Sequence, residues 1–246
     1  VSEQARAASV AASDRLRQRA LALGLVHALP AMLAHVAETA PLIIHIDARE
    51  LLPLLNDDSH YRNQFEVGES MAHGEDLEDR QEDESFIFHG VYDDAEPHER
   101  VKYGVMNITG DLRGVRSAAE RYGSDFLVLH HNCRERATFS WTDSAYSGDV
   151  HLATCRHYSH VLLEFDDAEL QALARVASGE PFVLSFAFER YKECQVHGPV
   201  KLTRDVEALC LTGSAMTASR SLRDAVNTFQ GKTGCNVLWQ DDLLAD

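Results

Sequence analysis

The sequence has no apolar run long enough to span a membrane, although it is 246 residues long. A membrane-spanning helix needs about 20 predominantly apolar residues. The best candidate, residues 20–37, is interrupted by His27, Pro30 and His35. We therefore expect a soluble protein without a membrane partner.

Cysteine is also scarce. The five cysteines are odd in number and form no CxxC pair. Small secreted scaffolds use a denser, even set of cysteines to build disulfides. The sequence therefore argues against a disulfide framework and favours a reducing compartment.

Positive charge is outnumbered, with 23 Lys and Arg residues against 39 Asp and Glu residues and a net charge of −16. A protein that binds DNA or RNA needs a cationic face that releases counterions, so a nucleic-acid polymer is a poor partner. A basic protein surface suits this charge better. Seven of the ten residues at 75–84 are acidic, and this segment is predicted to be a solvated loop or a mobile helix.

Several catalytic signatures are missing, namely GxxxxGK[ST], GxGxxG after a strand, HExxH and GxSxG. Their absence weakens the kinase, Rossmann and hydrolase interpretations. Thirteen histidines invite a metal interpretation, but zinc needs three or four ligands at suitable spacings. The densest group is irregularly spaced, so we expect no metal site and keep a metal-dependent hydrolase as an alternative. That group comprises His130, His131, Cys133, Cys155, His157 and His160.

The order of apolar and polar residues predicts an α+β fold. No internal repeat and no Gly/Ser-rich linker divides the chain, so we expect a helical N-terminal segment at 1–40 and one domain at 41–246. Helices are predicted at 1–38, 112–122 with Asp111 as N-cap, 168–177, 205–209 and 222–229. Strands are predicted at 42–46, 86–88, 103–108, 125–131, 136–141, 161–165, 182–188 and 191–196.

Three polar patches could carry chemistry. On a strand, Glu193, Gln195 and His197 share one face, where a carboxylate can stabilise a cationic sugar transition state. Thr138 and Ser140 also alternate, so their hydroxyls can position a neighbouring carboxylate. In the third patch, Arg62 could grip a phosphate. The order of arginine, Ser/Thr strand and glutamate strand is that of the Arg–Ser–Glu ADP-ribosyltransferases.

Longer segments resemble an uncharacterised bacterial family with a pattern of QFE, KYG, TFxxxDS and ExQVHGP motifs. The resemblance covers about residues 41–209 and rests on YRNQFEVGES (61–70), ERVKYGVMNI (99–108), RATFSWTDS (136–144) and YKECQVHGPVKLTRDVEAL (191–209). The chain is also similar to the CteC-type bacterial effectors, which transfer ADP-ribose from NAD to a threonine of ubiquitin.

The second resemblance implies an ADP-ribosyltransferase-like fold in which two short, strongly bent sheets enclose an NAD cleft. It implies a mono-ADP-ribosyltransferase that uses NAD as co-substrate and modifies a host protein such as ubiquitin, thereby blocking ubiquitination. We expect a monomeric bacterial effector delivered to the host cytosol. The acidic segment 75–84 would then meet a basic face of the protein substrate.

The resemblance also implies the site residues, but the sequence leaves their roles open. Transferases carry Glu-x-Glu or Gln-x-Glu, whereas this chain has Glu193-x-Gln195. Either Glu193 or Glu66 is then the catalytic acid, and a non-catalytic binding module on a decayed transferase fold is an alternative. Glu66, Asp143 or His197 could be the base for the acceptor hydroxyl. The catalytic candidates are Glu193, Gln195 and Glu66, and the NAD-binding candidates are His45, Arg49, Arg62, Gln64, Tyr103, Thr138, Ser140 and His197.

Overall fold

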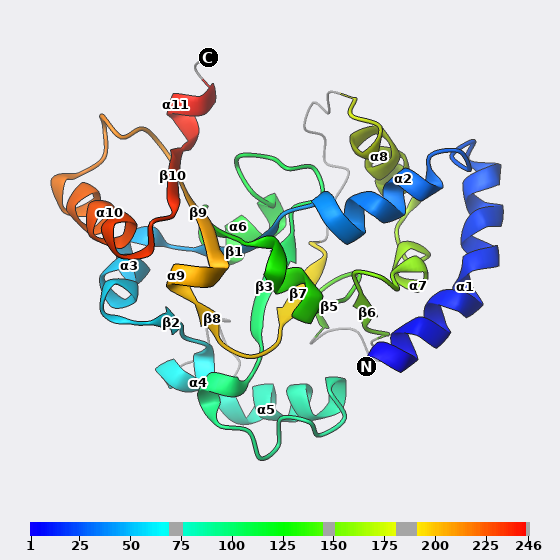
Figure 1. The fold of residues 1–246 in the computed structure, drawn as a ribbon, viewed down its shortest axis with the longest axis horizontal. Coiled ribbons are helices and arrows are strands. Elements are labelled where there is room, and N and C mark those ends of the chain that lie inside the picture. The colour runs from blue at the N-terminus through cyan, green and yellow to red at the C-terminus, as the bar shows by residue number, and fades with distance from the viewer. Residues whose placement is uncertain (69–75, 145–150, 181–190, 245–246) are drawn as a thin grey trace.

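The strands form two sheets in the computed structural model, which describes residues 1–68, 76–144, 151–180 and 191–244 (Figure 1). Neighbouring strands are antiparallel except for the parallel pair of β9 and β10. The larger sheet has eight strands in the order β10 (Asn236–Trp239), β9 (Val206–Leu211), β4 (Asp125–Leu129), β1 (Leu42–Ile46), β3 (Lys102–Met106), β7 (Glu193–Val196), β5 (Ala137–Phe139) and β6 (Ala153–Thr154). The smaller sheet pairs β2 (His60–Tyr61) with β8 (Val200–Lys201).

The described helices lie around the eight-stranded sheet. Figure 1 shows α1, α2, α7 and α8 at one end of the molecule and α3, α10 and α11 at the other. The α-helices are α1 (Ser2–Ala22), α2 (Leu29–Ala34), α3 (Ala48–Asp57), α4 (Gln64–Val67), α5 (Leu77–Ile87), α6 (Arg116–Tyr122), α7 (Ser159–Leu162), α8 (Asp167–Ala177), α9 (Leu202–Asp205), α10 (Arg220–Thr233) and α11 (Gln240–Leu244). A π-helical turn covers His35–Thr39, and 3-10 turns cover Pro97–Glu99 and His131–Arg136. The part of the chain that the structure describes contains no helix long and apolar enough to cross a membrane.

Most predicted elements are confirmed in position, including the strands at 42–46 and 191–196 and the helix at 168–177. The last of these begins as expected, because Asp166 and Glu169 form a reciprocal capping box. One predicted helix begins later than expected. Helix α6 starts at Arg116 and not at 112, since the Asp111 side chain accepts from the Arg113 N–H in the preceding turn.

Two predicted strands are helical, and one predicted helix is a strand. Residues 86–88 end α5 and 161–165 overlap α7, because short apolar runs cannot distinguish a strand from a buried helical turn. Residues 205–209 lie mainly in β9, where pairing with β4 outweighs the local helical pattern. The strand expected at 182–188 lies outside the described residues.

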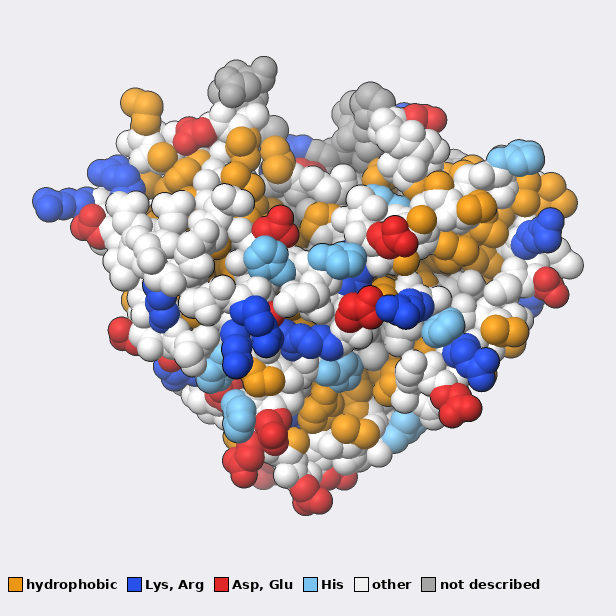
Figure 2. Space-filling view, in the orientation of Figure 1, with side chains coloured by type: hydrophobic (Ala, Val, Ile, Leu, Met, Phe, Trp, Pro, Cys, Tyr) orange, Lys and Arg blue, Asp and Glu red, His pale blue; other side chains and the backbone are white. Residues whose placement is uncertain are grey.

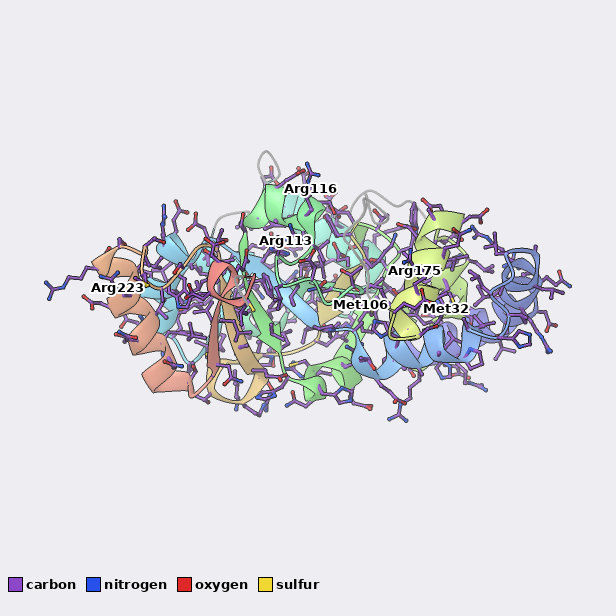
Figure 3. All side chains as sticks on the ribbon, turned by 90° about the horizontal axis from the view of Figure 1, so that it is seen from above. Met32, Met106, Arg113, Arg116, Arg175 and Arg223 are labelled. Carbon is purple, nitrogen blue, oxygen red and sulfur yellow. The ribbon has the colours of Figure 1, made fainter. Side chains whose placement is uncertain are left out.

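One face of the large sheet carries the main hydrophobic core. The helical N-terminal segment packs into this core through Leu16, Met32 and Val36, which join Ile44 and Met106 of the sheet in one cluster. Figure 3 labels Met32 and Met106. The segment at 1–40 thus shares its core with the residues that follow it.

The opposite face of the sheet changes from apolar to polar along the strand order. Ile43, Val105 and Phe126 form an apolar cluster there, against which Val115 and Tyr122 pack. The register places Glu193 directly opposite Val105, so the polar side chains of β7 continue the same face. This face is where the candidate site lies.

The resemblance to the effectors implies two short, strongly bent sheets. The described strands form one eight-stranded sheet and a separate two-stranded sheet. Strand β3 is the reason, because it pairs with β1 through Met106 and Leu42 and with β7 through Lys102 and Val196. The α+β class is confirmed by this mixture of helices and one large mixed sheet.

Candidate active site

Four polar side chains from β5, β7 and the residue after β5 gather on the polar face of the sheet. Thr138 lies opposite Gln195 in the register, and the Ser140 N–H donates to the Glu193 carbonyl at 3.1 Å. Alternate residues of a strand point to the same side. The pairing therefore brings Thr138, Ser140, Glu193 and Gln195 together, as the alternation in the sequence suggests.

The Glu193 carboxylate is held by two side-chain donors. Its Oε1 accepts from Ser144 Oγ at 2.5 Å and from Gln195 Nε2 at 2.7 Å. Gln195 Nε2 also donates to Ser140 Oγ at 3.1 Å, while Ser140 Oγ donates to the Thr142 carbonyl. Glu193 is 6% exposed and Gln195 is 0% exposed. The carboxylate is thus fixed in place by a buried polar network.

The charge state of Glu193 is balanced near neutral pH. Burial, together with the charge of Asp143, raises the pKa of Glu193 to about 7, and the donors Ser144 and Gln195 and the cation Arg80 limit this rise. A carboxyl group with such a pKa can hold or release a proton at neutral pH, which suits acid–base or electrostatic catalysis.

This pKa makes folding stability depend on pH, and Glu193→Gln should remove that dependence. The pKa of this carboxyl group is 4.5 in the unfolded chain, so the folded protein binds the proton more tightly. Stability is therefore lost as pH rises from about 4.5 to about 7. At pH 8 the variant should be more stable by about 3 kcal/mol, or roughly 6–12 °C in melting temperature.

The difference between the two proteins should shrink toward zero at pH 4.5. Thermal melts of both proteins from pH 4.5 to pH 8 check this expectation. Parallel curves for the two proteins across that range would contradict the assigned pKa.

Glu193 lies at the wall of a cavity of about 90 Å³. The polar face of the sheet, Arg80 of α5, and Ala118 and Tyr122 of α6 enclose it. The wall is rich in phenol rings and carries charges of both signs. Its aromatic residues are Tyr61, Tyr103, Tyr122 and Tyr191, and its charged residues are Arg62, Arg80, Lys102, Asp143 and Glu193.

Several predicted residues meet at this cavity. Gln64, Tyr103, Arg62 and His45 line it together with Glu193. Gln64 is 7% exposed, and its Nε2 has no hydrogen-bond partner among the described residues. A buried donor without a partner is costly to the fold, so Gln64 marks a place where a ligand acceptor would be well bound.

His45 has a mainly structural environment despite lining the cavity. Its Nδ1 lies 2.8 Å from the Gly123 carbonyl, and its Nε2 accepts from the Val115 N–H at 3.1 Å. Nδ1 therefore carries the proton. Burial lowers the pKa of His45, so the ring is held neutral. Both ring nitrogens are already engaged in joining β1 to the residues around α6.

The two arginines predicted to bind NAD differ in position. Arg49 is exposed on α3, and it is not among the described residues that line the cavity. Arg62 does line the cavity, while its guanidinium makes two hydrogen bonds to Asp58, at 2.7 Å and 2.5 Å. Of these two arginines, Arg62 is thus the one that the described residues place at the cavity.

Glu66 is not among the described residues that line the cavity. It closes the capping box of α4 with Asn63, and its Oε1 lies 2.5 Å from His60 Nε2. Thr138, Gln195 and His197 are joined by hydrogen bonds to one another and reach the cavity through Glu193. Glu66 thus makes local structural contacts, whereas Glu193 lines the cavity.

Sequence reasoning missed Arg80, Ser144 and Tyr92. Arg80 is the one cation in the acidic segment 75–84, and that isolation was a usable signal. Ser144 ends the TFxxxDS motif, and its proximity to Glu193 could have been suspected from that motif. Tyr92 contacts His197 at 2.5 Å across 105 positions, and no sequence pattern indicates this contact.

The histidines and cysteines at 130–160 do not form a metal centre in the described parts of the chain. There, no group of three or more His, Cys, Asp or Glu side chains is arranged to hold a metal ion. All five cysteines are free and buried. Burial raises the pKa of the Cys133 thiol to about 11.

Comparison with known proteins gives one family. A family model described as "Protein of unknown function (DUF3626)" matches residues 44–166, which is half of the chain. The matched segment includes Gln64, Tyr103, Ser140 and Ser144, and it ends before Glu193. A search of curated proteins found no match.

Proposed function

This chain belongs to the DUF3626 family, whose function is unknown, and we propose that it is a mono-ADP-ribosyltransferase that uses NAD. The observation that carries the proposal is the fixed, buried Glu193 carboxylate at the wall of an aromatic, arginine-containing cavity. The pairing of a Ser/Thr strand with this glutamate strand supports it further.

In the proposed reaction, the bond between nicotinamide and the ribose of NAD breaks, and nicotinamide leaves with the bonding electrons. Positive charge then develops on the ribose carbon. The ionised Glu193 carboxylate stabilises this charge, and a fixed carboxylate does so without reorganisation during the step. The approaching cation also favours the ionised form of Glu193, whose pKa is about 7 in the free protein.

An acceptor hydroxyl completes the transfer by attacking the ribose carbon and giving up its proton. Asp143 is the proposed base because it lines the cavity beside Glu193. Its Oδ2 already accepts from the Tyr191 phenol at 2.5 Å and from Arg121 at 3.0 Å, which fixes its position. Glu66 caps a helix, and both ring nitrogens of His197 are engaged by Tyr92 and Thr138.

The size of the cavity limits how NAD binds. Typical ligand pockets enclose about 300–1,000 Å³, whereas this cavity measures about 90 Å³. Only the reacting end of NAD would enter it. The tyrosines would stack on the nicotinamide ring, and Arg62 and Arg80 would move to contact the pyrophosphate.

Exposed acidic side chains lie close to the proposed site. Glu78, Asp79 and Glu82 are exposed on α5, whose Arg80 lines the cavity. Acidic side chains also lie along the lower edge of the face in Figure 2, where Figure 1 shows α5. A basic protein surface would complement this helix. Ubiquitin, modified on a threonine by a monomeric effector, is therefore the proposed acceptor, and the proposed fold is a variant of the ADP-ribosyltransferase fold.

Gln64→Leu should weaken NAD binding while stabilising the fold. The substitution removes a buried N–H donor that has no partner among the described residues, so the melting temperature should rise. The ligand acceptor that Gln64 meets would lose a hydrogen bond, so KM for NAD should rise about 10-fold. Melting curves and nicotinamide-release kinetics measure the two effects.

Tyr158→Phe is the matched control for Gln64→Leu. The Tyr158 hydroxyl is also buried without a partner among the described residues, but it packs in the main core. This variant should gain stability with unchanged KM. An equal KM for Gln64→Leu and the parent protein would remove Gln64 from the binding site.

The proposed function is tested by incubating the protein with NAD and ubiquitin and weighing intact ubiquitin by mass spectrometry. The expected result is the gain of one ADP-ribose, with fragmentation placing it on a threonine. Release of nicotinamide without a gain in mass would retain the NAD chemistry and refute ubiquitin as the acceptor. The absence of both nicotinamide and modified ubiquitin would refute the proposed function.

A further inference from the structure

A line of hydrogen bonds leads from a distant tyrosine to the Glu193 carboxylate. The Tyr92 hydroxyl lies 2.5 Å from His197 Nδ1, and His197 Nε2 lies 3.0 Å from Thr138 Oγ1. Thr138 Oγ1 donates to Gln195 Oε1 at 2.8 Å. Gln195 Nε2 then donates to Glu193 at 2.7 Å.

The donor and acceptor of each hydrogen bond in this line follow from the Thr138 hydroxyl and from the charge of the His197 ring. Thr138 has one hydroxyl proton and donates it to Gln195. His197 Nε2 must therefore donate to Thr138. Burial lowers the pKa of His197 to about 4, with Arg136 adding to the effect, so the ring carries one N–H. Nδ1 is thus an acceptor.

Tyr92 supplies the first proton of the line. Burial raises the pKa of Tyr92 to about 12, so the phenol stays protonated and donates to His197 Nδ1. The His197 ring is also held by packing, since its centroid lies 5.5 Å from Phe88 and 6.0 Å from Tyr92. Every hydrogen bond from Tyr92 to Glu193 therefore points in the same direction.

We propose that Tyr92, His197 and Thr138 are positioning residues that orient the Gln195 amide toward Glu193 and favour the ionised form of its carboxylate in the cavity. Hydrogen bonds that all point one way polarise each other, and the effect adds at the acceptor end. Thr138 also fixes which way the Gln195 amide faces, because its hydroxyl donates to the amide oxygen. The inference rests on the proposed function for what Glu193 does in catalysis, but not for its charge.

The line acts on Glu193 together with other groups that face this carboxylate. Asp143 raises the pKa of Glu193, and Arg80 lowers it. Tyr103, Tyr122 and Tyr191 also lie near enough to interact electrostatically with Glu193. None of these groups belongs to the line, so a change in Thr138 or Tyr92 leaves their number and charge unaltered.

The test is a direct titration of Glu193 in the whole protein, without NAD. Glutamate labelled with carbon-13 at Cδ is followed by NMR from pH 4 to pH 9, and Glu193→Gln identifies the resonance. Thr138→Val breaks the line, so the titration midpoint should move to higher pH by about 0.5–1 pH unit. Tyr92→Phe should move it in the same direction by a smaller amount.

Two variants separate this role from a merely structural one. Thr138→Ser keeps the hydroxyl and should restore the parent midpoint. Tyr158→Phe removes a phenol hydroxyl from the main core and should leave the midpoint unchanged. An unchanged or lower midpoint in Thr138→Val would overturn the proposal. If that variant does not fold, an unchanged or lower midpoint in Tyr92→Phe would do so.

The titration and the enzyme assay can fail independently. Glu193 titration midpoints that move as expected, in a protein that never releases nicotinamide, would support the role of the line of hydrogen bonds and refute the proposed function. Unmoved midpoints in a protein that does release nicotinamide would refute the line and leave the proposed function standing.

Discussion

Glu193→Gln is expected to lower nicotinamide release from NAD by about 10²–10³-fold, the range observed when one fixed electrostatic contact to a transition state is removed. The amide has nearly the same shape, and its oxygen can still accept from Ser144 and Gln195. Only the negative charge is lost. KM for NAD should change little, because the charge matters most when the ribose becomes cationic.

The control for this variant is Glu207→Gln. Glu207 lies on β9 with an exposed side chain, so its neutralisation should leave the rate unchanged. Misfolding cannot explain the loss of rate if Glu193→Gln also melts at a higher temperature than the parent protein at pH 8. A fully active Glu193→Gln protein would show that another group stabilises the reaction.

Lys192→Met is expected to produce the largest loss of stability. Lys192 precedes strand β7, and its Nζ donates to Glu169 Oε1 at 2.5 Å in a buried ion pair. The ammonium also lies 4.4 Å from the Phe165 ring centroid. Removing one partner leaves a buried charge unpaired, which costs about 3–5 kcal/mol. The melting temperature should fall by roughly 6–20 °C.

A second substitution distinguishes the unpaired charge from lost packing. Glu169→Gln added to Lys192→Met removes the charge and keeps an acceptor for the Asp166 N–H that begins α8. The double variant should therefore recover part of the lost stability. Arg156→Met is the surface comparison, because the Arg156–Glu135 pair is exposed and should contribute little to stability. Equal losses in Lys192→Met and Arg156→Met would contradict a special role for burial.

Local patterns predicted the central strands well because those strands have strong one-dimensional signals. The run at 42–46 is apolar apart from His45 and is buried at every position, and the capping residues before α8 mark the start of that helix. The alternation of Glu193 and Gln195 likewise predicted the shared polar face. These features depend on neighbours in the sequence, so a sequence can reveal them.

Features that depend on distant residues could not be predicted. Residues 161–165 look like a strand, but their environment beneath α1 favours a helical turn. The acidic segment at 75–84 looks solvated, yet Glu84 is buried against Arg100 and Tyr103. Tyr92 reaches His197 only after the whole sheet has formed. In each case tertiary packing outweighs the local pattern.

The most direct test of the central claim measures nicotinamide release from NAD by the parent protein and by Glu193→Gln. The reactions are run at pH values from 5 to 9, and the released nicotinamide is quantified by chromatography. We predict release by the parent protein that rises with pH through about 7, as Glu193 ionises, and little release by the variant. No release by the parent protein at any pH, with or without ubiquitin present, would contradict NAD cleavage at this site.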